Sequence, residues 1–151
     1  MDIKIEDIKK LREKTRAGIA DSRRALDEAK GDIKKAEEPV KSWGIEKAAT
    51  KSDRVVGAGL IETYVHSGRV GVMVEVNCET DFVVKTDEFK NLAHEVAMQI
   101  SAMNPADIKE LLAQDYIRDS SKKVENLVKE TIAKVGENIV IRRFSRFELN
   151  Q

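Results

Sequence analysis

The hydrophobic pattern of this chain changes near residue 57, from a helical period to a strand period. Before that point apolar residues recur three and four positions apart, which places them on one face of a helix. After it, Val70, Val72, Val74 and Val76 alternate with other residues, so their side chains lie on one face of a strand. The 151 residues therefore predict a helical N-terminal part followed by a part built on a β-sheet.

Three short helices are predicted in the N-terminal part. The first covers residues 5–16, the second covers residues 20–30, and Asp32 is a suitable N-cap for the third. Trp43 lies on the apolar stripe of the third helix, so we expect it to be largely buried. Gly44 is expected to end that helix, because glycine is common just after the last helical residue.

The remaining part reads as strand, strand, helix, helix, strand. A Ser67-Gly68 pair between the first two strands indicates a hairpin turn. Each element has one apolar face to bury, so the order predicts helices packed on one face of a three-stranded antiparallel sheet, an α+β fold. The predicted strands cover residues 58–66, 69–77 and 138–149, and the predicted helices are capped by Asp87 and by Ser120 or Ser121.

We divide the chain into three parts on this pattern. Residues 1–44 form a three-helix module, residues 45–56 a partly helical linker, and residues 57–151 the α+β core domain. The length is sufficient for a small module and one core domain.

An acidic residue and a large aromatic residue, Asp81 and Phe82, stand side by side after the second predicted strand. Proteins often place working side chains in loops that a rigid sheet positions. Asp81 could repel or replace an anionic ligand, and Phe82 could enter a groove on another molecule. Alternatively, Phe82 fills the local core and Asp81 caps the next turn, and spacing alone favours this second interpretation.

Charge and hydropathy point to a protein partner. The 27 basic residues are balanced by 27 acidic ones, whereas proteins that bind nucleic acid directly concentrate an excess of Lys and Arg. No apolar run approaches the length of a membrane span, and the first residues lack the apolar region of a signal peptide. A single cysteine fits a reducing compartment. We therefore expect a cytoplasmic protein with no membrane and no nucleic-acid partner.

Enzymatic chemistry finds little support in the sequence. Cys78 could pair with His66 or His94 as thiol and imidazole, but no nucleophile motif surrounds it, and a small buried cysteine is the favoured interpretation. One cysteine and two distant histidines do not make a metal site. The run of residues 57–59 lacks the further residues of a phosphate-binding loop. We predict no catalytic residue, no metal and no cofactor.

Several blocks of the sequence resemble elongation factor Ts, and they occur in the order found in that family. The resemblance implies a module similar to the ubiquitin-associated (UBA) three-helix fold and a single α+β core. It also implies a guanine-nucleotide exchange factor for elongation factor Tu in its GDP-bound and nucleotide-free forms. The blocks that carry it are residues 8–15, 17–19, 24–26, 31–33, 47–49, 75–83 and 132–144.

The resemblance also assigns site residues. The family segment Thr-Asp-Phe-Val matches Thr80, Asp81, Phe82 and Val83, and it implies that this segment disturbs the magnesium site of the partner. The module is implied to dock on the nucleotide-binding domain of the partner. The candidates for that contact are Leu11, Arg12, Thr15, Gly18 and Ile19.

The chain departs from the family pattern at two places. The region between Asn104 and Leu127 is shorter than the resemblance leads us to expect. Short members of the family pair through a two-fold interface, so a homodimer is possible, but Ser145 excludes a covalent link at that position. The alternative function is a UBA-like adaptor without exchange activity, which would leave the run of residues 80–83 unexplained.

Overall fold

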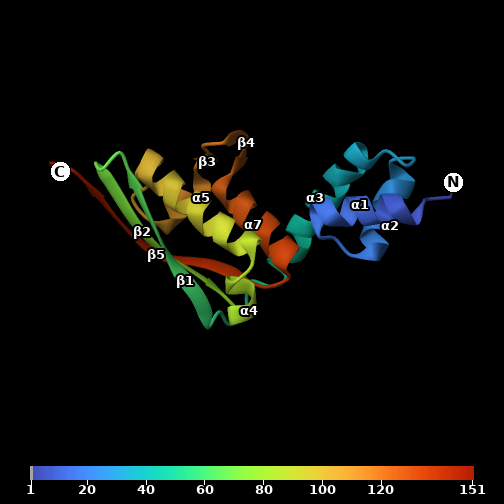
Figure 1. The fold of residues 1–151 in the computed structure, drawn as a ribbon, viewed down its shortest axis with the longest axis horizontal. Helices are drawn as coiled ribbons and strands as arrows, with labels where there is room; N and C mark the ends of the chain where they lie inside the picture. The colour runs from blue at the N-terminus through green and yellow to red at the C-terminus, as the bar shows by residue number, and fades with distance from the viewer. Residues whose placement is uncertain (1) are drawn as a thin grey trace.

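The computed structural model describes residues 2–151; Met1, the first residue of the predicted module, lies outside the described residues. Three helices gather at one end of the molecule and a sheet covered by helices forms the other (Figure 1). The elements in chain order are α1 (Ile5–Thr15), α2 (Ile19–Glu28), α3 (Ile33–Ala49), β1 (Ala58–His66), β2 (Val70–Cys78), α4 (Asp81–Val84), α5 (Asp87–Met103), α6 (Ile108–Ala113), β3 (Asp115–Tyr116), β4 (Asp119–Lys123), α7 (Val124–Val135) and β5 (Ile139–Glu148).

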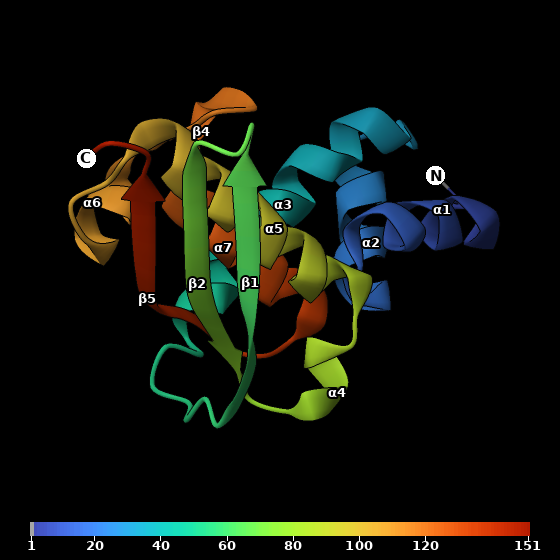
Figure 2. The same ribbon diagram turned by 60° about the vertical axis from the view of Figure 1, so that its left-hand side comes forward.

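The main sheet has the strand order β1-β2-β5, with both pairings antiparallel. The hairpin between β1 and β2 turns at Ser67 and Gly68, whose φ angles of 51° and 66° are those of the tight turn that suits twisted strands. Helices α5 and α7 lie behind the sheet in Figure 2, and the opposite face has no helix over it. The predicted α+β class and the three-stranded antiparallel sheet are confirmed.

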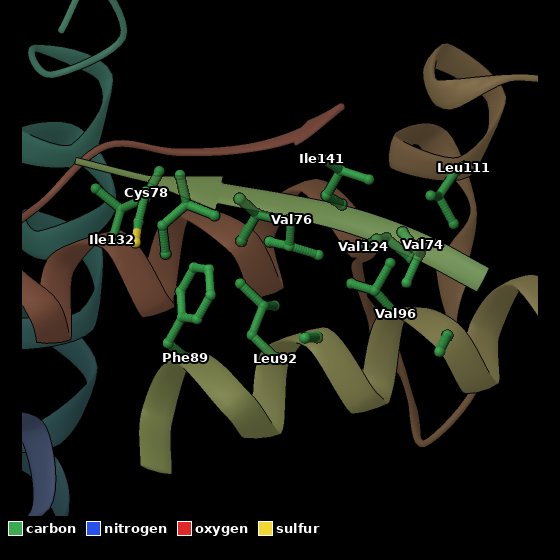
Figure 3. Close-up of a cluster of buried hydrophobic side chains, with 14 of the residues drawn as sticks. Val74, Val76, Cys78, Phe89, Leu92, Val96, Leu111, Val124, Ile132 and Ile141 are labelled. Atoms are coloured by element: carbon green, nitrogen blue, oxygen red, sulfur yellow. The ribbon is translucent and has the colours of Figure 1, made fainter. Parts of the chain in front are cut away.

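The larger core fills the space between the sheet and these helices. Val76 of β2 lies above Leu92 of α5 and Val74 above Val96, and all four are nearly or fully buried (Figure 3). Because β2 is the central strand, its inward side chains are covered by the helices and its edges by β1 and β5. The strand that leads to the Asp81–Phe82 pair is therefore the most enclosed part of the sheet.

The three N-terminal helices surround a second, smaller core that contains Leu11 and Leu26. Trp43 packs against this core and most of its surface is buried, in agreement with the expectation of a largely buried tryptophan. The guanidinium carbon of Arg24 lies 4.3 Å from the centre of the indole ring. A long basic side chain can cover an aromatic face in this way while its own charge stays in water.

Helix α3 does not end at Gly44, so the predicted helix end was wrong: the helix continues to Ala49. A single glycine weakens a helix by only about 1 kcal/mol, and packing against other elements outweighs that cost. Ala48 in the last turn is buried in the larger core, which holds this part of the helix in place. The division of the chain at residues 44 and 56 stays a prediction.

Two further helix starts differ from the predicted ones. Thr86, and not Asp87, caps α5, because its hydroxyl accepts a hydrogen bond from the Phe89 N–H at 3.3 Å. Ser120 and Ser121 do not cap a helix but belong to β4, and α7 begins at Val124. These residues form a strand because the fully buried side chain of Gln99 in α5 stabilises the β3–β4 hairpin. Its amide donates a hydrogen bond to the Asp115 carbonyl and accepts one from the Ile117 N–H.

We expect Phe89→Ala to lower the free energy of unfolding by about 3–5 kcal/mol, because Phe89 is 0% exposed and its removal leaves a cavity. The matched control is Phe82→Ala, which removes the same ring from a side chain that is 82% exposed and should cost less than about 0.5 kcal/mol. Urea unfolding of the two variants measures both values. Equal losses would contradict this assignment of core and surface.

Candidate functional site

Asp81 and Phe82 lie in α4, a single helical turn that is separated from the end of β2 by two residues. The turn starts at Thr80, whose hydroxyl accepts a hydrogen bond from the Val83 N–H at 3.4 Å. Val83 points into the larger core, while Phe82 is 82% exposed. The interpretation of Phe82 as a core residue and of Asp81 as the cap is therefore wrong, because Val83 and Thr80 hold those positions.

Glu137 holds the start of this turn from the other end of the chain. One carboxylate oxygen accepts the backbone N–H of Thr80 at 3.0 Å, and the other accepts the Thr80 hydroxyl at 2.8 Å. Glu137 stands immediately after Gly136, which ends α7 with a φ of 76°. The sharp turn at Gly136 thus brings the carboxylate to the end of β2, where it accepts hydrogen bonds from both donors of Thr80.

Asn138 connects the same place to the segment after α3. Its backbone N–H donates to Glu79 at 2.9 Å, and its side-chain amide donates to the carbonyls of Arg54 at 2.9 Å and Ser52 at 3.3 Å. Arg54 in turn lies 3.6 Å from the Glu79 carboxylate. Three chain segments therefore meet at the base of α4 through one buried residue, Asn138, which bonds Glu79 by its backbone N–H and the segment after α3 by its side-chain amide.

Sequence reasoning did not identify Glu137 and Asn138 as site residues. They entered only within the block of residues 132–144 that carries the resemblance. Glu137 and Thr80 are 57 positions apart in the sequence. The periodicity of apolar residues predicts helices and strands, but it does not predict contacts between residues so far apart. The place of Glu137 and Asn138, directly after a helix-ending glycine and before the last strand, is the only local signal.

The surroundings of α4 carry negative charge. Burial raises the pKa of the Cys78 thiol, and the charges of Glu137, Asp81 and Glu79 act in the same direction. The thiol donates to the carbonyl of Thr80 at 3.3 Å, so it helps to hold the turn. An exposed aromatic ring and an exposed carboxylate are therefore presented together on an acidic, well-anchored turn.

A Cys78-dependent reaction lacks a base in this arrangement. His66 bonds the hydroxyl of Tyr64 at 2.9 Å, and the His94 ring meets the Tyr64 ring edge-on at 5.8 Å between centroids. Within residues 2–151, no hydrogen bond joins Cys78 to either histidine. A buried thiol with a raised pKa stays protonated near neutral pH, so it is a poor nucleophile.

The five candidates in the module gather at the connection between α1 and α2, but they differ in exposure. Leu11 is fully buried in the smaller core, so it supports the surface without reaching it. Thr15 is half-buried; its hydroxyl donates to the Leu11 carbonyl at 2.8 Å and accepts the Ala17 N–H at 3.3 Å. The exposed members are Arg12, Gly18 and Ile19.

The structure does not join the module candidates to the α4 turn directly. Across residues 2–151 no hydrogen bond or ion pair connects the two sets. Thr15 and Gly18 instead line a groove of about 520 Å³ between the module and α7, together with Lys41 and Lys134. The two sets are thus separate parts of one molecular surface.

The part of the chain that the structure describes contains no cluster of three or more His, Cys, Asp or Glu side chains arranged to hold a metal ion. No helix of that part is long and apolar enough to cross a membrane.

Comparison with known proteins shows which family the chain is similar to. The family model for "Elongation factor TS" matches residues 79–151. The "Elongation factor Ts" of Thermoanaerobacter sp. (strain X514) is 43% identical over 192 residues, covering 97% of this chain and 94% of the relative. That of Thermotoga maritima is 40% identical over 195 residues, covering 100% and 98%.

This chain belongs to the elongation factor Ts family. It is accordingly a translation elongation factor of protein biosynthesis. The region matched by the elongation factor Ts model begins at Glu79, so it contains the whole α4 turn and Glu137.

The chain is shorter inside the matched region than its elongation factor Ts relatives. The alignment with the Thermoanaerobacter protein extends over 192 residues, whereas this chain has 151, so the relative carries residues that this chain lacks. We predicted that the shortening lies between Asn104 and Leu127, and this position stays a prediction. The structure has only α6 and the small β3–β4 hairpin before α7 there.

Glu137→Ala should speed the hydrogen exchange of the Thr80 amide, because the acceptor of that N–H and the acceptor of the Thr80 hydroxyl are lost together. Glu125→Ala, which removes an exposed carboxylate paired with Lys129 at 2.9 Å on α7, is the control and should leave that amide unchanged. Exchange followed by NMR resolves the single amide. Unchanged protection in Glu137→Ala would show that the carboxylate does not hold the turn.

Proposed function

We propose that this elongation factor Ts family member is a guanine-nucleotide exchange factor that promotes GDP release from elongation factor Tu. The observation that carries the proposal is the exposed Phe82 on a turn whose base is fixed by Glu137 and Asn138. A large apolar side chain held out into solvent costs the isolated protein free energy. Its exposure on an anchored turn leaves the ring available to a partner that would cover it.

The turn is suited to disturb a magnesium and phosphate site. Mg²⁺ bridges the nucleotide phosphates and protein ligands, and much of the nucleotide affinity depends on that arrangement. Phe82 would enter between helices of the partner and move its ligands, while Asp81 would bring a negative charge towards the phosphate region. Because the turn is anchored before binding, little conformational freedom is lost when it enters.

The proposed action needs no covalent step, and we propose that the protein is not a catalyst of a chemical reaction. The factor has to bind nucleotide-free elongation factor Tu more tightly than the GDP-bound form, otherwise it shifts no equilibrium. The coupling is reciprocal, so nucleotide expels the factor by the same free energy. We also propose that it acts in the cytoplasm, without direct contact to nucleic acid or membrane.

The module is proposed to dock on the nucleotide-binding domain of the partner and to have the UBA-like fold. Arg12, Gly18 and Ile19 present exposed groups at the connection between α1 and α2, and Thr15 stabilises that connection. If the chain were instead a UBA-like adaptor, the same surface of the module would bind a protein other than elongation factor Tu. That alternative provides no role for the exposed Phe82, and for this reason we favour the exchange factor.

We expect Phe82→Ala and Asp81→Ala to slow the stimulated release of GDP by roughly 5-fold to 150-fold, the range of typical coupling free energies between two sites. Both changes leave the core intact, because both side chains are exposed. The measurement is release of fluorescent GDP from elongation factor Tu at saturating factor. Leu149→Ala, which truncates another exposed apolar side chain, is the control and should release GDP at the wild-type rate.

The same assay without magnesium separates the mechanism from a general loss of binding. Once a chelator has removed Mg²⁺, the step assigned to Phe82 and Asp81 is already done, so the difference between variant and wild type should shrink. A defect of equal size with and without the chelator would contradict the proposed action on the magnesium site.

We further propose that two copies pair through the sheet face that no helix covers. Ile61, Val65, Met73 and Phe147 lie on this face, and each is more than half exposed. Sheets commonly pack face to face with such side chains between them. The ion pair of Glu75 with Arg143, 3.0 Å apart, neutralises charge on the same face, and the formal net charge of the chain is zero, so two copies do not repel each other.

Met73→Lys should convert the proposed dimer into a folded monomer, because two buried ammonium groups would have no partner charge. Sedimentation equilibrium over a range of concentrations measures the mass. Glu13→Lys changes the charge of an exposed residue on α1 and should leave the dimer intact. A wild-type protein that stays monomeric at all concentrations would refute the pairing.

A further inference from the structure

We infer that the crossing of α3 and α7 at Gly44 and Ala133 is a joint that fixes the N-terminal module relative to the α4 turn, and that Gly44 is a positioning residue for nucleotide exchange. The second half of the inference rests on the proposed function, in which the module and the turn contact the same partner. The joint itself is a property of this chain and can be tested without the partner.

Only glycine fits at the crossing point. A Cβ atom placed on Gly44 would lie 2.9 Å from the Cβ of Ala133. Carbon atoms in contact prefer about 3.5–4.0 Å, so the two helices would have to move apart. The Cβ of Ala133 is attached directly to the backbone of α7 and cannot rotate away, as the end of a long side chain would.

Helix α3 belongs to both cores. Ala36 and Val40 are buried in the smaller core of the module, and Ala48 in the last turn is buried in the larger one. Figure 1 shows α3 passing without a break from the module to the side of α7. The module cannot turn independently unless this helix bends or the crossing opens. A second link, the ion pair of Arg16 with Glu88 at 3.1 Å, has an exposed Arg16 and contributes little free energy.

The ends of both crossing helices are tied to the α4 turn. Helix α7 ends at Gly136, and the next residue, Glu137, holds Thr80. The segment after α3 is held by Asn138 through the carbonyls of Ser52 and Arg54. A change in the spacing of the two helices at Gly44 would therefore move the module with respect to Phe82.

In the proposed complex the module and the α4 turn are two contact surfaces, and the fixed distance between them affects the affinity of the whole factor for its partner. When one surface is engaged, the second is held at a high effective concentration near its own site, and this gain is lost if the geometry no longer matches. Widening the crossing should therefore weaken binding of the whole factor. The exchange rate at saturation should change less, because the α4 turn itself is still anchored.

The joint is tested by the distance between two nitroxide labels in the free protein. Arg23→Cys on α2 and Lys90→Cys on α5 are both exposed positions, and Cys78 is fully buried and stays unlabelled under native conditions. Gly44→Ala should shift the distance distribution, and the added substitution Ala133→Gly should restore it. Gly57→Ala is the control, since a Cβ there meets no atom within 4 Å.

The positioning role is tested by GDP release from elongation factor Tu as a function of factor concentration. Gly44→Ala should raise the concentration for half-maximal stimulation by roughly 10-fold or more, and Gly44→Ala with Ala133→Gly should return it to the wild-type value. Gly57→Ala should behave as wild type. Because the clash would also lower stability, GDP release is compared at a temperature at which all the variants are folded.

Each outcome decides one part of the inference. An unchanged label distance in folded Gly44→Ala overturns the joint, and a shifted distance with an unchanged half-maximal concentration overturns the positioning role. If wild-type protein does not stimulate GDP release, the proposed function fails while the distances still decide on the joint. If Gly44→Ala does not fold, folding of the compensated pair supports the joint, and failure of that pair overturns it.

Discussion

The burial of β2 is the constraint from which the rest of the arrangement follows. This strand pairs on both edges, with β1 and with β5, and its inward valines lie against α5. Strands enclosed in this way are among the last parts of a protein to open. Only two residues separate the end of β2 from the α4 turn, so the central strand fixes the position of the turn.

The α4 turn separates stability from function at adjacent positions. Val83 supplies the apolar contact that the larger core needs, and Phe82, one residue earlier, is free to meet another molecule. The acids around the turn divide in a similar way. Glu79 and Glu137 accept hydrogen bonds from the backbone, whereas Asp81 takes part in none of the ion pairs found within residues 2–151. The side chains proposed to act on a partner are thus those that the fold does not use.

The parts of the fold that were predicted correctly are those whose signals are local. The alternation around Val74 and the Ser67-Gly68 turn define the hairpin without any distant contact. The errors have the opposite cause. Gly44 lies inside a helix because Ala48 is held by the larger core, and Ser120 lies in a strand because Gln99 holds the hairpin.

The candidate site shows the same limit. The sequence places Asp81 beside Phe82, but exposure of Phe82 and burial of Val83 differ from the reverse arrangement by only a rotation of the turn. The place of Phe82 after a strand allowed a role in binding, but spacing alone favoured the wrong choice, and the family resemblance was needed to reverse it. The anchors Glu137 and Asn138 act across 57 to 86 positions, a range that no local pattern records.

The reduced length of this chain bears on which parts the function requires. The region after Asn104 still closes the larger core, because Leu111 and Val124 are fully buried there and Gln99 with Glu95 bonds the β3–β4 hairpin. The module, the Gly44–Ala133 crossing and the α4 turn all lie outside residues 104–127. A shortening confined to that region, as we predict, therefore leaves in place every contact by which the module and the turn are fixed to one another.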